Sequence, residues 1–395
     1  MMTEKTPDAG LPSLPVIHFV SGFLGSGKTT AIVGLCRLLM GQGVRTAIVT
    51  NDQGRRQVDL AFARAGGIPA VAVSNGCLCC RWDDFEERVL ALAADEQPQL
   101  IFAESVGSCA DLVATVIKPF TEFRDRLRPR GRLSTFVDIR MLEARLTGVT
   151  LPFSQNVLYI FDKQLEEADI ILVNKRDRFS DESARADRVH ELARQRFPHA
   201  AVILSSALDN DDLLRWNQLL SQYDGVQEPA ALEIDYERYA AGEMELAWLD
   251  QVVRVRAAPE CRAAAIGLIQ RLAAGLQGAS AAVGHFKCTL TPVRPAADGA
   301  AESTGATIKL SLTTMDAADD LIRQLDALPR RMGPEAELTI NIRALAEPLQ
   351  LKAVADSAVA ATTTAFAAMI NVTDQHAFRP GYPTPVHRFS RKNKD

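Results

Sequence analysis

The chain has 395 residues, of which 47% are hydrophobic and 24% are charged, and its formal net charge at pH 7 is -5. This is the composition of an ordinary globular protein, and the length exceeds what one hydrophobic core usually supports, so two domains are expected. The negative net charge gives no bulk attraction to nucleic acid or to an anionic membrane, and neither is expected as a partner.

Residues 1–15 contain three prolines and no apolar run, which predicts a disordered tail rather than a signal peptide. The most apolar late segment, residues 353–372, is interrupted by Asp356, by threonines and by Asn371, which argues against a membrane span. A cytoplasmic location is therefore expected, where cysteines stay reduced.

From residue 16 to about 225, short β-branched runs alternate with longer helical patterns. That alternation predicts an α/β domain with a doubly wound, mostly parallel sheet. The first predicted strand, Val16–Val20, leads into a glycine-rich turn and then a helix, which is the arrangement of a phosphate-binding P-loop. The residues expected to hold the nucleotide phosphates are Gly22, Gly25, Ser26, Gly27, Lys28, Thr29 and Thr30.

Acidic turns follow two later strands of this predicted sheet. Asp52 ends one strand and Glu104 ends another. Carboxylates at these places, together with the hydroxyl of Thr29, are expected to bind the Mg²⁺ that accompanies a nucleotide. Lys28, Asp52 and Glu104 are the candidate catalytic residues, and the separate roles of the two carboxylates stay open.

Asn174-Lys175-Arg176-Asp177 follows the hydrophobic strand Ile170–Val173, at the sheet edge where ligands of open α/β sheets bind. A carboxylate can accept hydrogen bonds from N1–H and from the amino group of guanine, whereas adenine has no donor at N1. Asp177 is therefore the expected guanine selector, with Asn174 and Lys175 beside it. Ser205-Ser206-Ala207, after the next strand, resembles the second base-contacting loop of GTPases, which implies that Ser206 and Ala207 lie at the base. The sequence thus predicts GTP as the ligand.

Three cysteines lie within four residues, at Cys77, Cys79 and Cys80. Three thiolates at this spacing can converge on one cation such as Zn²⁺, Cu(I) or Co²⁺. Cys109 and solvent are the two alternatives for the fourth ligand. A structural zinc clip and inert thiols are the alternatives to a transfer site.

The second half of the chain changes its pattern. Residues 226–250 are predicted to be a linker followed by a helix. Residues 251–372 show a β-α-β-β-α-β pattern and a final helix, which predicts a smaller α+β ferredoxin-like domain. Residues 373–395 are proline-rich and predict an extended tail.

In chain order, the motifs GFLGSGKTT, NDQG, NGCLCC, ESVGS and NKRD resemble those of the CobW-type metal-centre GTPases, whose relatives include UreG-like and HypB-like nickel insertion proteins. The resemblance implies a P-loop GTPase that binds and hydrolyses GTP and couples its nucleotide state to the delivery of a transition metal. It implies Zn²⁺ or Co²⁺ on Cys77, Cys79 and Cys80, and Mg²⁺ near Asp52 and Glu104. The partner it implies is a client metalloprotein or cofactor-assembly enzyme, and a homodimer stays open.

The alternative function is a GTPase chaperone that gates a client metalloenzyme or corrinoid enzyme, with the cysteines only bracing a loop. Removing the thiols would then destabilise the fold. In the metal-transfer hypothesis the same change abolishes metal binding and leaves the metal-free fold nearly as stable. An ATP-dependent kinase is disfavoured by the pattern at Asn174–Asp177.

Overall fold

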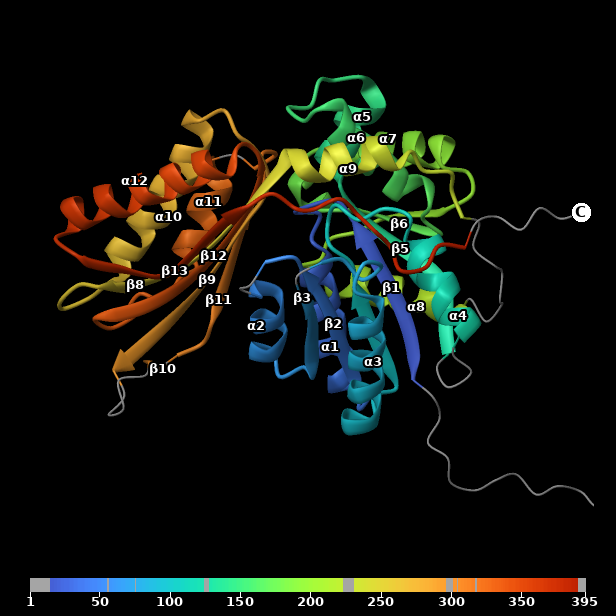
Figure 1. Ribbon diagram of the computed structural model, residues 1–395, viewed down its shortest axis with the longest axis horizontal. Helices are drawn as coiled ribbons and strands as arrows, with labels where there is room; N and C mark the ends of the chain where they lie inside the picture. Colours follow the sequence, from blue (N-terminus) through green and yellow to red (C-terminus); the bar gives the residue numbers. More distant parts are fainter. Residues whose placement is uncertain are drawn as a thin grey trace, which may run out of the picture.

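The computed structural model describes residues 15–54, 57–74, 76–123, 128–222, 231–295, 301–303, 305–316 and 318–389. They form two sheets, each covered by helices, which lie side by side (Figure 1). The expected N-terminal tail, apart from its last residue, and most of the expected linker lie outside the described residues. None of the helices in the described ranges combines the length and apolar character needed to cross a bilayer.

The first sheet has seven parallel strands in the order β3-β2-β4-β1-β5-β6-β7. Their bounds are β1 (Val16–Gly22), β2 (Thr46–Asp52), β3 (Ala70–Ser74), β4 (Leu100–Glu104), β5 (Arg128–Asp138), β6 (Ile170–Asn174) and β7 (Ala201–Leu204). The predicted doubly wound parallel sheet is confirmed. The edge strand β3 is an addition to the predicted strands, because its alanines give a weak strand signal.

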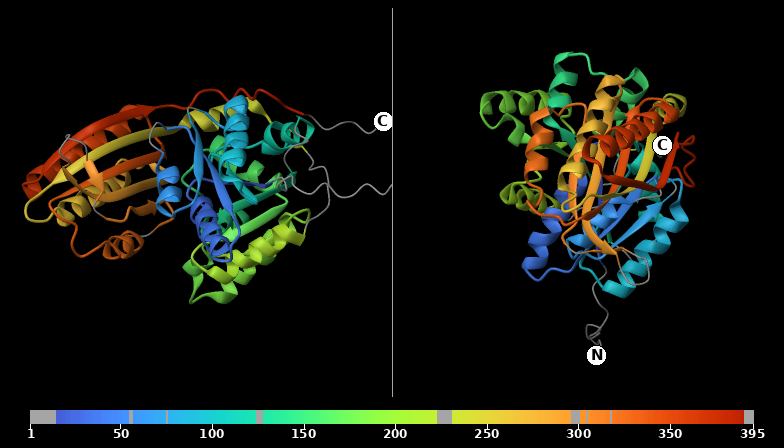
Figure 2. Two further views of the ribbon diagram at one scale, coloured as in Figure 1. Left: turned by 90° about the horizontal axis from the view of Figure 1, so that it is seen from below. Right: turned by 90° about the vertical axis from the view of Figure 1, so that its left-hand side faces the viewer.

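Helices cover both faces of this sheet (Figures 1 and 2). Their bounds are α1 (Lys28–Gly41), α2 (Val58–Ala65), α3 (Trp82–Glu96), η1 (Val113–Ile117), α4 (Lys118–Phe123), α5 (Ile139–Thr147), α6 (Gln155–Glu166), η2 (Arg176–Phe179), α7 (Ser183–Arg196) and α8 (Asn210–Gln222). On one face, Leu35 of α1 and Trp216 of α8 pack into one apolar cluster. On the other, Val89 of α3 packs with Phe120 of α4. This packing holds the carboxyl ends of the strands at one edge, where ligands of such sheets bind.

The second sheet is antiparallel, with the order β10-β9-β12-β8-β13 and with β11 paired to β9. The helix α9 (Tyr236–Glu245) leads into this sheet and packs on α6 of the first domain. The second domain consists of β8 (Leu246–Arg256), α10 (Arg262–Gly278), β9 (Ala282–Pro295), β10 (Ala301–Ser303), β11 (Ile308–Leu312), α11 (Ala318–Asp326), β12 (Glu335–Leu345), α12 (Pro348–Phe366) and β13 (Met369–Phe378). The main elements from β8 to β12 follow the predicted β-α-β-β-α-β order, and α12 and β13 extend it. The predicted C-terminal α+β domain is confirmed.

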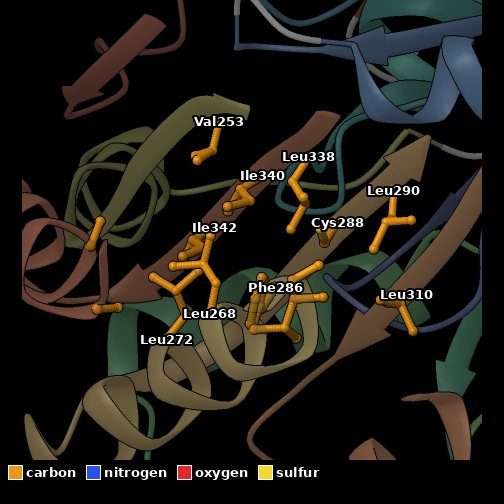
Figure 3. Close-up of a cluster of buried hydrophobic side chains, with 14 of the residues drawn as sticks. Val253, Leu268, Leu272, Phe286, Cys288, Leu290, Leu310, Leu338, Ile340 and Ile342 are labelled. Carbon is orange, nitrogen blue, oxygen red and sulfur yellow. The ribbon is translucent and has the colours of Figure 1, made fainter. Parts of the chain in front are cut away.

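One face of the second sheet carries the core of this domain. Leu268 and Leu272 of α10 pack against Phe286 of β9 and Ile342 of β12 (Figure 3). These side chains are at most 3% exposed. Burial of this apolar layer is the main stabilising contribution to the second domain.

Two predicted boundaries need correction. Residues 226–250 were expected to form a linker and a helix, but the helix α9 ends at Glu245 and the strand β8 begins at Leu246. Residues 373–378 were expected to belong to an extended tail, but they form the end of β13 and pair with β8. Both errors arise because pairing with distant strands decides the conformation of these segments.

The face of the second sheet opposite its helices lies against the first domain (Figure 1). Nη2 of Arg140, at the start of α5, lies 3.0 Å from Oδ1 of Asp316. Arg178, in the turn after β6, forms an ion pair with Asp320 of α11. The second domain therefore contacts the loops at the carboxyl edge of the first sheet.

Candidate nucleotide site and cysteine centre

The glycine-rich turn between β1 and α1 has the conformation of a closed phosphate-binding loop. Gly27 adopts a left-handed conformation with φ of 96° and caps α1. The Nζ of Lys28 donates a hydrogen bond of 2.6 Å to the carbonyl of Gly22, at the other end of the turn. Burial lowers the pKa of Lys28 to about 8. The backbone N–H groups at the start of α1 and the ammonium of Lys28 lie in the same turn, so this turn is a suitable binding site for an anion.

The predicted base-reading residues meet one another and the phosphate-binding turn. Asn174 donates through Nδ2 to the carbonyl of Ser26 at 2.7 Å, and its Oδ1 accepts from the backbone N–H of Ala207 at 2.9 Å. The hydroxyl of Ser206 donates to Oδ1 of Asp177 at 2.6 Å. The structure thus brings together three loops that the sequence placed far apart.

Lys175 occupies the left-handed region with φ of 63°. Its Nζ lies 3.0 Å from Oδ2 of Asp138, which also caps α5. Asp138 thereby holds the ammonium of Lys175 at the carboxyl edge of the sheet, in the same loop as Asn174. This is a role for Asp138 that its place after a strand did not reveal.

The magnesium candidates lie beside Lys28. Thr29 donates through Oγ1 to Oε1 of Glu104 at 2.9 Å. The other oxygen of Glu104 is buried and has no hydrogen-bond partner within the described part of the chain. Burial, together with the charge of Asp59, raises the pKa of Glu104. A buried carboxylate oxygen with spare capacity next to a threonine hydroxyl fits a hard cation. Asp52 ends β2, but its side chain lies outside the described residues.

The sulfurs of Cys77, Cys79 and Cys80 lie within 4.8 Å of one another. Sγ of Cys77 is 3.0 Å from that of Cys79 and 2.9 Å from that of Cys80. The turn is compact because the backbone N–H of Arg81 bonds to the carbonyl of Cys77 at 2.9 Å, just before α3 begins. Three sulfurs at this spacing are a suitable donor set for a borderline or soft cation.

Cys109 adds a fourth sulfur that contacts Cys77. A side-chain hydrogen bond with Cys109, followed by those with Cys79 and Cys80, holds the pKa of the Cys77 thiol well below its usual value. The contact with Cys77 raises the pKa of each of the other three thiols, that of Cys80 to about 12. Because sulfur binds a metal as thiolate, a metal that takes these cysteines as ligands displaces the protons of their thiols.

Asn51 connects the cysteine turn to the strand that ends at Asp52. Its Oδ1 accepts from the backbone N–H of Leu78 at 3.0 Å, and its Nδ2 donates to the carbonyl of Gly76 at 2.8 Å. The loop after β4 makes the second connection, since Glu104 ends β4 and Cys109 lies five residues later. Asn51 thus links the cysteine turn to Asp52, and the loop after β4 links it to Glu104, the other candidate magnesium ligand. The sequence does not reveal the role of Asn51, because an asparagine after a strand is common.

A cavity of about 490 Å³ opens over the cysteines. Cys77 and Cys80 line it together with Tyr239 and Glu243 of α9. Residues 379–389, which we call the C-terminal strap, run from β13 back to the first domain (Figure 2). The backbone N–H of Val386 donates to the carbonyl of Cys79 at 3.0 Å, and Arg388 pairs with Asp111 at 2.7 Å. Access to the cysteines is thus bounded by α9 and by the strap.

The strand order, the turn after β1 and the loops at the sheet edge together define a P-loop nucleotide-binding protein. Residues 16–204, just under half of the chain, match the family model of the CobW/HypB/UreG nucleotide-binding domain. The resemblance predicted from the motifs is confirmed.

Curated relatives share the same part of the chain. Zinc-regulated GTPase metalloprotein activator 1 of Dictyostelium discoideum is 27% identical over 234 residues, covering 51% of this chain and 48% of that protein. Zinc chaperone CobW of Sinorhizobium sp. is 27% identical over 198 residues, 45% of this chain and 54% of that protein. Zinc chaperone YeiR of Escherichia coli K12 is 28% identical over 176 residues, covering 43% of this chain and 49% of that protein. The chain spans about half the length of these curated relatives.

Among solved structures, HypB from Helicobacter pylori in complex with nickel superposes on 55% of this chain and 92% of that one, with a TM-score of 0.40 and 18% identity. HypB from Archaeoglobus fulgidus superposes on 53% of this chain and 89% of that one, with a TM-score of 0.36 and 18% identity.

Proposed function

We propose that this protein binds and hydrolyses GTP and couples its nucleotide state to the binding and delivery of a transition metal, zinc or cobalt, through Cys77, Cys79 and Cys80. One observation carries the proposal. The turn with the three cysteines is attached to the ends of β2 and β4, the strands that also bear Asp52 and Glu104. A change in the position of Asp52 or Glu104 therefore reaches the sulfurs through the contacts of Asn51 and Cys109.

For the nucleotide, the turn from Gly22 to Thr30 and the ammonium of Lys28 are proposed to hold the phosphates, while Asn174, Lys175, Asp177, Ser206 and Ala207 hold the guanine. A Mg²⁺ ion, when bound, neutralises charge on the β and γ phosphates. Thr29 and Glu104 would hold that ion, because they already meet and one oxygen of Glu104 is spare. Asp52 is proposed to assist there or to orient the attacking water. Lys28 adds charge stabilisation at the phosphate that is transferred.

Replacing Asp177 by asparagine is expected to weaken GTP binding at least about 100-fold, because the carboxylate that accepts from the guanine amino group becomes an amide donor. Xanthosine triphosphate carries an oxygen in place of that amino group, so the same variant should bind it more tightly than GTP. Competition against a fluorescent nucleotide measures both affinities. The matched control is Asp181→Asn, which removes an exposed carboxylate between β6 and α7. Unchanged affinities in Asp177→Asn would contradict the assignment.

For the metal, the proposed ligands are Cys77, Cys79 and Cys80, with Cys109 as the neighbouring fourth sulfur. The contact between Cys109 and Cys77 supports this choice over solvent, since Cys109 is fully buried. The names of the curated relatives support zinc as the metal that is carried. A client metalloprotein is proposed as the acceptor, in keeping with the name of the Dictyostelium relative.

The coupling is proposed to act as a switch. GTP and Mg²⁺ fix the turns around Asp52 and Glu104, and Asn51 and the loop to Cys109 transmit this to the sulfurs. Such coupling is reciprocal, so the metal must change nucleotide affinity by the same factor. If the cysteines only brace the loop and the GTPase gates a client enzyme, the two ligands bind independently.

A further inference from the structure

Strand β9 of the second domain passes directly over the phosphate-binding turn of the first. A Cβ atom placed on Gly25 would lie 2.9 Å from the carbonyl oxygen of Gly284 and would overlap the side chain of Thr313. Gly25 also has φ of 70°, a conformation that favours glycine. The turn that is proposed to hold the phosphates is therefore covered by a strand from another domain.

Three residues further along β9, Lys287 faces the first domain. Its Nζ lies 2.5 Å from Oδ2 of Asp59, in the first turn of α2. Lys309, on the adjacent strand β11, lies 2.7 Å from the other oxygen of the same carboxylate. Asp59 is almost fully buried, and the two lysines are mostly buried too. The two ammonium groups thus share one carboxylate between the domains.

The two lysines differ in their place relative to the phosphate-binding turn. Lys309 pairs in register with Thr289, two residues beyond Lys287 and further from Gly284 along β9. Its ammonium lies 4.8 Å from the ring centre of Phe62, on α2. Burial, opposed by the charge of Glu104, lowers the pKa of Lys28, and the charge of Lys287 adds to this lowering. Lys287 is therefore the lysine of the pair that lies on the phosphate side.

We propose that Lys287 contacts the terminal phosphate of the bound nucleotide and stabilises the transition state of hydrolysis in cis, from the second domain. The inference rests on the proposed GTP hydrolysis. Asp59 keeps Lys309 as its partner when Lys287 turns to the phosphate, so the buried carboxylate stays neutralised. The four-methylene side chain of lysine gives the ammonium the freedom to make this turn.

The step itself balances without a further reactant. The oxygen of a water molecule forms a bond to the γ phosphorus, and the bond from that phosphorus to the β,γ-bridging oxygen breaks with its electron pair left on GDP. The proton released by the water passes to the phosphate product. Lys287 stays protonated throughout and lowers the energy of the charge on the transferred group. Docking of the second domain is then a condition for fast hydrolysis.

The test compares Lys287→Met with the double variant Asp59→Asn/Lys309→Met, which removes both ion pairs between the domains but keeps Lys287 and leaves no buried carboxylate to hold it. In single-turnover hydrolysis, Lys287→Met should slow the reaction at least about tenfold with GTP affinity nearly unchanged, whereas the double variant should keep most of the wild-type rate. Lys287→Arg should recover part of the rate, since it restores the charge. GDP with aluminium fluoride, an analogue of the transition state, should bind Lys287→Met more weakly and the double variant normally.

If Lys287→Met and the double variant hydrolyse GTP and bind the fluoride complex equally well, Lys287 is only a bridge between the domains, and the inference is overturned. Equal losses in both, with equal falls in melting temperature, would also overturn it. If the wild-type protein does not hydrolyse GTP, the proposed function fails, and the fluoride complex still tests the position of Lys287 separately.

Discussion

Arg343→Met is expected to destabilise the protein by about 3–5 kcal/mol, because it leaves a buried carboxylate without its cation. The guanidinium of Arg343 is fully buried in β12 and pairs with Glu243 of α9. It also donates to the hydroxyl of Ser108 at 2.5 Å, and Ser108 in turn donates to Glu243 at 2.7 Å. Three segments distant in the sequence therefore meet at one ion pair between the domains.

Urea unfolding of the metal-free protein measures this effect. The matched control is Arg254→Met, which removes a half-exposed pair with Glu337 on the same sheet and should cost less than about 1 kcal/mol. Replacing Arg343 and Glu243 together by apolar residues should recover much of the loss, since no unpaired charge is then buried. A loss in Arg343→Met no larger than in Arg254→Met would show that the pair does not hold the domains together.

The Arg343 pair also bears on the metal centre. Ser108 directly precedes Cys109 in the loop after β4. Glu243 lines the cavity over the cysteines, and burial raises the pKa of its carboxyl group. Loss of Arg343 therefore frees the loop that carries the fourth sulfur and removes the partner of an acid beside the site.

Cys77→Ser is expected to weaken the binding of Co²⁺ or Zn²⁺ by at least about 100-fold, because the sulfur of Cys77 contacts those of Cys79 and Cys80 and its hydrogen bond with Cys109 holds the pKa of its thiol below the usual value. Ligand-to-metal absorption of the cobalt complex measures it. Cys261→Ser, a buried thiol at the start of α10, is the matched control and should leave the band unchanged.

The melting temperature of the metal-free variant separates the two hypotheses for the cysteines. A metal-transfer site predicts a small change in Cys77→Ser, similar to that in the Cys261→Ser control. Thiols that only brace the loop without a metal predict a large fall in the melting temperature together with little or no stoichiometric metal binding in the wild-type protein.

The local motifs could be read from the sequence, since their chemistry is set by neighbouring residues. The turn from Gly22 to Thr29 needs glycines and a lysine at fixed spacing, and the loop at Asn174 needs a preceding buried strand. Both conditions are visible in a single segment. The parallel sheet could be predicted for the same reason, because each buried strand is a continuous apolar run.

Contacts between distant segments could not be predicted in this way. Nothing near Arg343 in the sequence indicates Glu243, and nothing near Lys287 indicates Asp59. The choice of Cys109 over solvent beside Cys77 depends on where the loop after β4 folds. The strand β13 and the strap after it depend on pairing with β8 and contact with the cysteine turn. These positions are set by the packing of the two domains rather than by local propensity.

The most direct test of the central claim is a titration of the reduced, metal-free protein with Co²⁺ and then Zn²⁺, with and without GTP and Mg²⁺. The connections through Asn51 and through the loop from Glu104 to Cys109 predict a cysteine-dependent cobalt band whose midpoint shifts with nucleotide, and an equal shift of GTP affinity with metal. No band, or the same metal affinity in both nucleotide states, would contradict a metallochaperone whose nucleotide state controls its cargo.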